Sequence, residues 1–254
     1  MNLLSVERLD GVAVLRLNDP ARRNIVSLPL VAEIESAMSD LEAEDAVRAV
    51  IVTGAGSVFS AGADFADLDA ARRGNSEGLK RIYRGFLRIA ECPLPTIAAV
   101  NGPAVGAGMN LALACDLRVA AETAVFDTRF LTLGLHPGGG HTWMLNRAVG
   151  WQGAVAMLLL GLILNGREAA ERGLALSCVP DDQLMPTAIQ LASRAASFPI
   201  ELLRRAKASM RRAIQGNDHA DAVRLEYEQQ LWALMQPEFR ELLNVARAAS
   251  SRSK

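Results

Sequence analysis

The hydrophobic positions along the chain follow two periods, and each period predicts one kind of element. Val12–Leu17 alternates as a strand does, and with Leu3–Leu9 before it and an Asp-Gly pair between them it predicts an opening hairpin. Leu28–Glu44 carries its apolar residues at helical spacing. Ala49–Thr53 is a short apolar run that ends in a glycine turn, which is the pattern of a buried strand.

The two periods continue through the rest of the chain. Helices are predicted at Phe65–Arg72, Glu77–Glu91, Met109–Cys115 and His141–Val149, and strands at Thr96–Asn101, Asp116–Ala120, Ala124–Asp127 and Ala175–Val179. The most apolar run, Ala154–Leu164, is too short to span a bilayer and is expected to be a buried helix. Strand, glycine turn and helix in series predict an α/β fold with parallel pairing, and the last part of the chain reads as an all-α section.

Composition narrows the functional classes. The 254 residues suffice for one large core, and the net charge of -1 gives no electrostatic footprint for nucleic acid or for an anionic membrane, so neither is expected as a partner. The three cysteines are scattered, with no metal-ligand or disulfide spacing. They predict reduced thiols in a cytoplasmic protein, and no secretory signal is expected at the start.

The chemically informative features are three glycine-rich turns, at residues 60–64, 102–108 and 137–140, each of which precedes a predicted helix. Glycine allows a sharp turn, and the start of a helix presents unpaired N–H groups and the positive end of the helix dipole. Two such N–H groups that converge on one oxygen form an oxyanion hole.

Two of these turns resemble motifs of the enoyl-CoA hydratase/isomerase (crotonase) family. Phe59–Leu68 (FSAGADFADL) resembles the family's first oxyanion turn and its CoA-contacting loop. Asn101–Asp116 (NGPAVGAGMNLALACD) resembles the second oxyanion turn and the helix behind it. Arg22–Asn24 and Gly134–Gly140 match as well, in chain order. The resemblance covers nearly the whole chain.

The resemblance implies a fold and an assembly. Residues 1–200 are expected to form a crotonase-like spiral of ββα units that carries the acyl-CoA site. Residues 201–254 are expected to form a helical trimerisation section, in a homotrimer or hexamer. The implied partner is an acyl-CoA thioester, as in fatty acid metabolism, with no separate cofactor because coenzyme A is part of the substrate, and with no metal.

The resemblance also implies roles for individual residues. The backbone N–H groups of Ala61 and Ala107 would hold the thioester carbonyl and stabilise an enolate-like oxyanion. The substrate-binding residues implied are Arg22, Arg23, Gly62, Ala63, Asp64, Gly106 and Gly108. Arginine suits the phosphates of coenzyme A as a bidentate donor, although simple solvation explains each arginine equally well.

The sequence departs from the family at its acid/base positions. Family hydratases use two glutamates, whose positions are Asn110 and Phe130 here, and the position where some relatives have an aspartate is Gly138. Asn can hold a water molecule but takes no proton at neutral pH, and Phe does neither. Candidate substitutes are Asp127, His136 and His141, although each also has a structural explanation, such as pairing of Asp127 with Arg129.

Phe130 with Phe126, Leu131 and Trp143 predicts an apolar acyl pocket, although core packing explains these residues too. Two functions remain open: an enzyme with enoyl-CoA hydratase- or isomerase-like chemistry, and a non-catalytic acyl-CoA binder or carrier. A dinucleotide-dependent oxidoreductase is disfavoured, because Thr53–Gly62 lacks the GxGxxG spacing.

Overall fold

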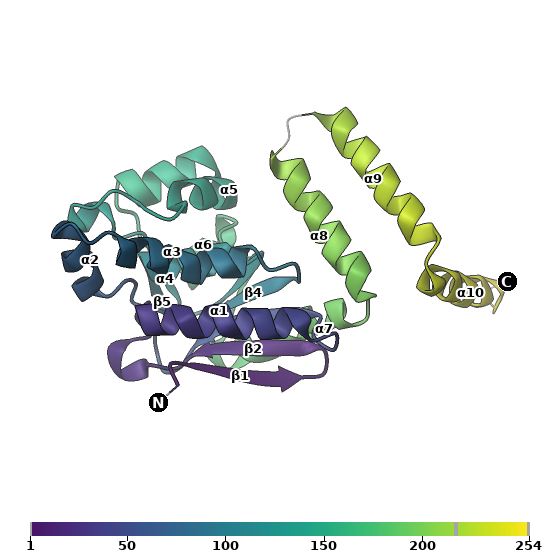
Figure 1. Cartoon of the computed structure of the whole chain (residues 1–254), viewed down its shortest axis with the longest axis horizontal. Coiled ribbons are helices and arrows are strands. Elements are labelled where there is room, and N and C mark those ends of the chain that lie inside the picture. Colours follow the sequence, from purple (N-terminus) through teal and green to yellow (C-terminus); the bar gives the residue numbers. More distant parts are fainter. Residues whose placement is uncertain (1, 216–217, 253–254) are drawn as a thin grey trace. The chain divides into compact units, whose positions relative to one another are not determined.

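The computed structural model describes residues 2–215 and 218–252 of the chain, and these divide into two compact units between Ala196 and Ser197 (Figure 1). The division falls a few residues before the boundary expected from the sequence. The first unit is the α/β part and carries the candidate site. The second unit is helical throughout its described elements.

The first unit is built on a mixed six-stranded sheet in the order β1-β2-β3-β4-β6-β9. Its strands are β1 (Leu4–Leu9), β2 (Val12–Leu17), β3 (Ala49–Gly54), β4 (Thr96–Val100), β6 (Leu117–Ala121) and β9 (Ser177–Val179). β1 and β2 form the predicted antiparallel hairpin, and every later pair is parallel. β3 and β4 are buried along their whole length, because helices cover them, and this explains why both read as continuous apolar runs.

A second, three-stranded sheet consists of β5 (Pro103–Val105), β7 (Val125–Asp127) and β8 (Leu164–Asn165). The strand β5 was not predicted, because its three residues lie inside a glycine-rich turn. β5 pairs in parallel with β7 and thereby brings the second glycine turn next to the segment that follows residue 127.

The helices of the first unit follow the predicted order. They are α1 (Leu28–Ala43), α2 (Phe65–Arg72), α3 (Glu77–Ala90), α4 (Ala107–Ala114), α5 (His141–Ala154), α6 (Gly166–Glu171) and α7 (Leu184–Ala196). Short 3₁₀ turns lie at Pro20–Arg22, Leu131–Leu133 and Asp181–Gln183. α7 packs Leu184, Ala188 and Ala192 against one face of the large sheet and closes the core there.

The prediction of a buried helix over Ala154–Leu164 is wrong. α5 ends at Ala154, a single π-helical stretch covers Val155–Leu159, and the chain then leaves the helix at Gly161, whose φ of 70° lies in the left-handed region. Leu159 and Leu160 are exposed. Hydrophobic composition alone therefore predicted neither where this helix ends nor that Leu159 and Leu160 are exposed.

The second unit consists of α8 (Ile200–Gln215), α9 (His219–Leu234) and α10 (Pro237–Arg252). Arg205 of α8 donates a hydrogen bond to Gln229 of α9 at 2.9 Å and stacks on the ring of Trp232 at 3.9 Å. Several apolar side chains of these helices are exposed, among them Met210, Val223 and Val245.

No helix in the described part of the chain is both long enough and apolar enough to cross a membrane.

Candidate active site

The two glycine turns that follow β3 and β4 lie side by side in the first unit. Ser60 and Ala104 form a parallel bridge, in which the Ser60 N–H donates to Pro103 O at 3.1 Å and the Val105 N–H donates to Ser60 O at 3.0 Å. A Cβ added at Gly62 would lie only 2.7 Å from Val105 O, so glycine is required for this close approach. The backbones of both predicted oxyanion turns therefore meet.

A backbone hydrogen bond in the first turn contradicts the predicted role of Ala61. The Ala61 N–H donates to Arg23 O at 3.0 Å, so it is already satisfied within the chain and is not free to bind a substrate oxygen. The prediction of Ala61 as an oxyanion donor is therefore wrong.

The backbone N–H of Ala63, two residues after Ala61, is available to a substrate oxygen. Val26 donates to Gly62 O at 2.8 Å and accepts from the Asp64 N–H at 3.4 Å, which makes a parallel bridge between Val26 and Ala63. In a parallel bridge the central residue's own N–H points away from the partner. Among the described residues the Ala63 N–H has no acceptor.

Ala107 is the first residue of α4, and the first N–H groups of a helix have no partner within the helix. No acceptor for the Ala107 N–H lies elsewhere in the described ranges either. Gly106 before it has a φ of 52°, which glycine tolerates. Ala63, Gly106 and Ala107 all line one cavity.

A buried polar residue fixes the shape of the first turn. The Asn24 side chain donates to Ala55 O at 2.9 Å and to Val58 O at 2.7 Å, and it accepts from the Asp19 N–H at 3.0 Å. Asn24 also accepts, at its own carbonyl, a 2.7 Å hydrogen bond from the Ser60 hydroxyl. Asn24 thus joins the turn, through Ser60, to the segments that hold Asp19, Ala55 and Val58.

Of the other predicted binding residues, only some face the cavity. Arg22 forms an ion pair with Asp64 at 2.7 Å, and Asp64 also caps α2 by accepting from the Ala66 N–H. Neither Arg22 nor Asp64 lines the cavity, whereas Arg23 does. Gly108 does not line it and instead gives close packing, because a Cβ there would collide with Ser60 O.

The cavity has a volume of about 350 Å³ and is mainly apolar. The side chains of its apolar wall are Phe65 and Leu68 of α2, Leu79, Ile82, Tyr83 and Phe86 of α3, and Phe130, Leu133 and Leu135 of the segment after β7. Sequence reasoning missed the contribution of α2 and α3. Their signal was the i, i+3, i+4, i+7 spacing of apolar residues in Glu77–Ala90.

The predicted acyl pocket is correspondingly wrong in three of its four residues. Trp143 is half-exposed, stacks with Arg147 at 3.6 Å, and does not line the cavity. Phe126 is fully buried in the core, and Leu131 faces a second recess. Only Phe130 lies in the cavity wall, because the chain turns at Arg129, whose φ is 58°.

The two positions aligned with the family's glutamates do meet at the cavity. The Asn110 side-chain amide donates to Gly138 O at 3.1 Å, and its oxygen lies 2.7 Å from His141 Nδ1. The Phe130 ring contacts the edge of the His141 ring, with centroids 4.8 Å apart. Asn110 therefore uses one of its two amide N–H groups and its oxygen within the protein.

The three candidate acid/base side chains lie in different environments. Asp127 is buried, bonds Arg129 Nε at 2.8 Å, and lines the second recess instead of the cavity. His141 is 1% exposed, does not line the cavity, and burial lowers its pKa to about 4. His136 lines the cavity and is exposed, with Nδ1 2.8 Å from Pro137 O.

The cavity wall contains no aspartate or glutamate among the residues that the structure describes. Nor do the described ranges hold a group of three or more His, Cys, Asp or Glu side chains arranged for a metal ion. The chemistry that this geometry offers is binding of an oxygen by backbone amides within an apolar cavity, with one histidine at its wall.

Comparison with known proteins identifies the family of the chain. The family model described as enoyl-CoA hydratase/isomerase matches residues 7–241. A probable enoyl-CoA hydratase of Mycobacterium tuberculosis, EchA14, is 47% identical over 243 residues, with 93% of each chain covered. The 1,2-epoxyphenylacetyl-CoA isomerase of Escherichia coli is 39% identical over 194 residues, with 74% of each chain covered.

The fold gives the same result. The crystal structure of an enoyl-CoA hydratase from Bacillus anthracis superposes with a TM-score of 0.91 at 31% identity and covers 97% of this chain and 96% of its own. The predicted crotonase-like α/β fold is thereby confirmed, and the chain belongs to the enoyl-CoA hydratase/isomerase family.

Proposed function

We propose that this protein binds an acyl-CoA thioester with the carbonyl oxygen between the N–H groups of Ala63 and Ala107. The observation that carries the proposal is that both N–H groups lack an acceptor within the described chain and belong to residues that line one cavity. An N–H group without a partner in the chain can donate to a ligand, so a cavity with two of them is suited to an oxygen that carries negative charge.

The oxyanion that these amides stabilise is an enolate. Removal of a proton from the carbon next to the thioester places charge on the carbonyl oxygen, and a donor aimed there lowers the barrier. Removing one such donor typically slows turnover by about 10²–10³-fold. The positive end of the α4 dipole, at Ala107, adds to the effect.

The proposed reaction is double-bond isomerisation of an enoyl-CoA. Hydration by two carboxylates has no support here, because Asn110 is engaged, Phe130 is apolar, and the described cavity wall holds no carboxylate. Isomerisation needs only one group that takes a proton from C2 of a 3-enoyl thioester and returns a proton at C4. His136 is suited to this role because an imidazole exchanges protons near neutral pH.

Arg23 is the proposed contact to coenzyme A, since it lines the cavity and a guanidinium matches phosphate. The trimer or hexamer remains a proposal too. It is supported by the exposed apolar side chains on α8, α9 and α10, and multi-angle light scattering tests it.

The alternative is an acyl-CoA binder or carrier without turnover. The observation that favours it is that Asn110 and Phe130 offer no proton to a substrate. It requires the same two amides and therefore the same mode of binding.

An assay with 3-hexenoyl-CoA distinguishes the two. Isomerisation gives the conjugated 2-enoyl thioester, which is followed by ultraviolet absorbance, and calorimetry measures binding in parallel. The proposal predicts turnover that falls at least a hundredfold in His136→Gln and is unchanged in His219→Gln, a histidine of α9 that is also exposed. Binding without turnover supports the carrier, and absence of binding contradicts both.

A further inference from the structure

The hydroxyl of Tyr83 occupies the space that a side chain at position 138 would need. A Cβ added at Gly138 would overlap Tyr83 Oη and lie 2.9 Å from Tyr83 Cζ. Both residues line the cavity. The absence of a side chain at Gly138 thus admits the tyrosine hydroxyl to this wall.

The neighbouring glycine and phenylalanine hold the ring in place. A Cβ at Gly139 would overlap the ring of Phe86, and the centroids of the Tyr83 and Phe86 rings lie 5.8 Å apart. Asn110 fixes the glycine turn itself through its 3.1 Å hydrogen bond to Gly138 O. The two aromatic rings of α3 therefore fit against a glycine backbone that is anchored from α4.

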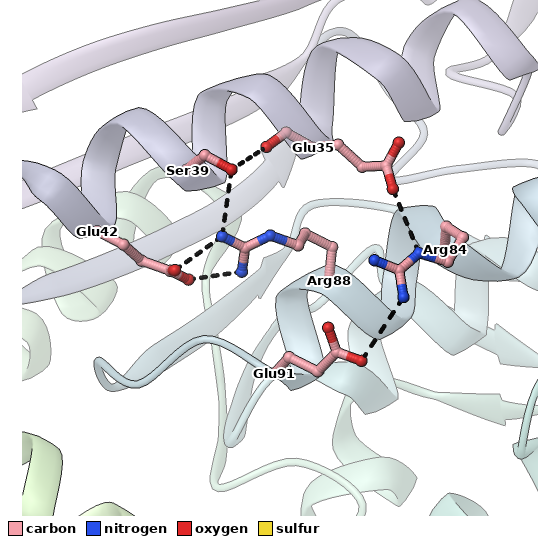
Figure 2. A network of polar contacts seen from close by, with 6 residues as sticks. All are labelled: Glu35, Ser39, Glu42, Arg84, Arg88 and Glu91. Carbon is pink, nitrogen blue, oxygen red and sulfur yellow. Dashed lines mark hydrogen bonds and ion pairs between the residues drawn. The ribbon is translucent and has the colours of Figure 1, made fainter.

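The helix that carries Tyr83 is itself fixed on α1 (Figure 2). Arg88 forms two hydrogen bonds with Glu42, at 2.6 and 2.7 Å, and Arg84 contacts Glu35 at 3.3 Å. Gly85 lets α3 approach closely, because a Cβ there would lie 2.8 Å from Val31. These contacts limit the freedom of the Tyr83 hydroxyl to shift along the cavity wall.

Of the polar side chains in the cavity wall, Arg23 and His136 have the roles proposed above, which leaves Tyr83, Asn110, Thr128 and Arg129. Asn110 is engaged on both sides, the Thr128 hydroxyl donates to Met157 O, and Arg129 bonds Asp127. Tyr83 Oη has no hydrogen-bond partner in the described part of the chain. Burial raises the pKa of the Tyr83 hydroxyl, so it stays protonated and is a hydrogen-bond donor at neutral pH.

We infer that Tyr83 determines specificity, by donating a hydrogen bond from its hydroxyl to an oxygen atom carried on the acyl chain of the bound thioester. The substrate class is then an acyl-CoA with a hydroxyl or similar oxygen beyond the thioester, in place of a plain hydrocarbon chain. A site that hydrogen-bonds a substrate oxygen disfavours the analogue without it, because its own polar group is left unpaired. The inference rests on the proposed thioester site.

The test uses three thioesters of equal chain length: hexanoyl-CoA, 3-hydroxyhexanoyl-CoA and 5-hydroxyhexanoyl-CoA. Calorimetry gives the Kd of each for the wild-type protein and for Tyr83→Phe. We expect at least one hydroxylated ligand to bind the wild type about fivefold more tightly than hexanoyl-CoA. That preference, measured as the ratio of the two Kd values, is expected to disappear in Tyr83→Phe.

Tyr227→Phe is the matched control, because it deletes the hydroxyl of the exposed tyrosine in α9 and is expected to keep the preference. Gly138→Ala is a second probe. Its added methyl group is expected to displace Tyr83 Oη and remove the preference, although the tyrosine itself is not substituted. An equal change for all three ligands in Tyr83→Phe, or no preference in the wild type, overturns the inference. Failure of every ligand to bind the wild type contradicts the proposed function instead.

Discussion

Asn110 and His141 form a buried hydrogen bond of 2.7 Å in which His141 Nδ1 is the donor. The Asn110 amide nitrogen donates to Gly138 O, so the oxygen of the same amide must face His141. The imidazole proton is thereby assigned to Nδ1, and Nε2 is left as a buried nitrogen with no partner in the described structure. His141 thus orients Asn110 and carries no charge at neutral pH.

This pair makes stability depend on pH. Burial lowers the pKa of His141 from 6.5 to about 4 in the folded state, so between those values the unfolded chain binds a proton that the folded chain does not. The contribution of His141 to stability is complete above pH 6.5 and falls by up to about 3 kcal/mol as the pH decreases to 4. Urea unfolding at a series of pH values measures it.

The matched variants are His141→Gln and His136→Gln. In His141→Gln, the free energy of unfolding is expected to lose most of its dependence on pH between 6.5 and 4. In His136→Gln, where the histidine is exposed, that dependence is expected to remain. Identical pH profiles for wild type and His141→Gln would show that the imidazole titrates normally.

Asn24→Ala is expected to destabilise the protein by about 3 kcal/mol. It removes three hydrogen bonds that a fully buried side chain makes to Asp19, Ala55 and Val58, and it leaves an ordinary side chain at a φ of 53°. Thermal or urea unfolding checks this, with Asn75→Ala at an exposed turn as the control. A change of less than about 1 kcal/mol would mean that the turn keeps its shape without this residue.

Removing the contact between α1 and α3 is also expected to cause a measurable loss of stability. Arg88 and Glu42 form a part-buried pair joined by two hydrogen bonds, and Arg88→Met removes both bonds from the Glu42 carboxylate (Figure 2). We expect the free energy of unfolding to fall by about 2 kcal/mol. Lys80→Met removes the exposed ion pair with Glu77 on the same helix and is expected to have no measurable effect. Equal effects of the two variants would contradict a special role for Arg88.

The spacing of apolar residues predicted most of the fold, because the buried positions of strands and helices are mostly occupied by apolar residues. The run Ala49–Thr53 became β3, and the predicted helix over His141–Val149 matches α5 up to Gly150, where a φ of 68° interrupts the helix. The π-helical stretch at Val155–Leu159 was missed, since its apolar side chains look the same in sequence whether they are buried or exposed.

The site was harder to predict, because its geometry depends on residues distant in the chain. Ala61 and Ala63 lie in the same small-residue turn, and only the bridge to Val26 decides which N–H is free. The role of Tyr83 likewise depends on Gly138, which lies on another element. Helical periodicity showed that α3 has an apolar face but not what that face contacts.

The central claim is that two backbone amides bind the thioester oxygen, and Ala107→Pro tests it. Proline fits the first position of a helix and deletes the N–H without changing a polar side chain. His219→Pro, at the first position of α9, is the control for the substitution itself.

The measurement is difference infrared spectroscopy of bound hexanoyl-CoA, isotopically labelled at the thioester carbonyl carbon. Because it reads the carbonyl bond directly, it needs no turnover. We expect that binding to the wild type and to His219→Pro lowers the carbonyl stretching frequency, and that about half of this shift is lost in Ala107→Pro, where one donor remains. A bound thioester whose carbonyl frequency equals that in water, or a shift that Ala107→Pro leaves unchanged, would contradict it.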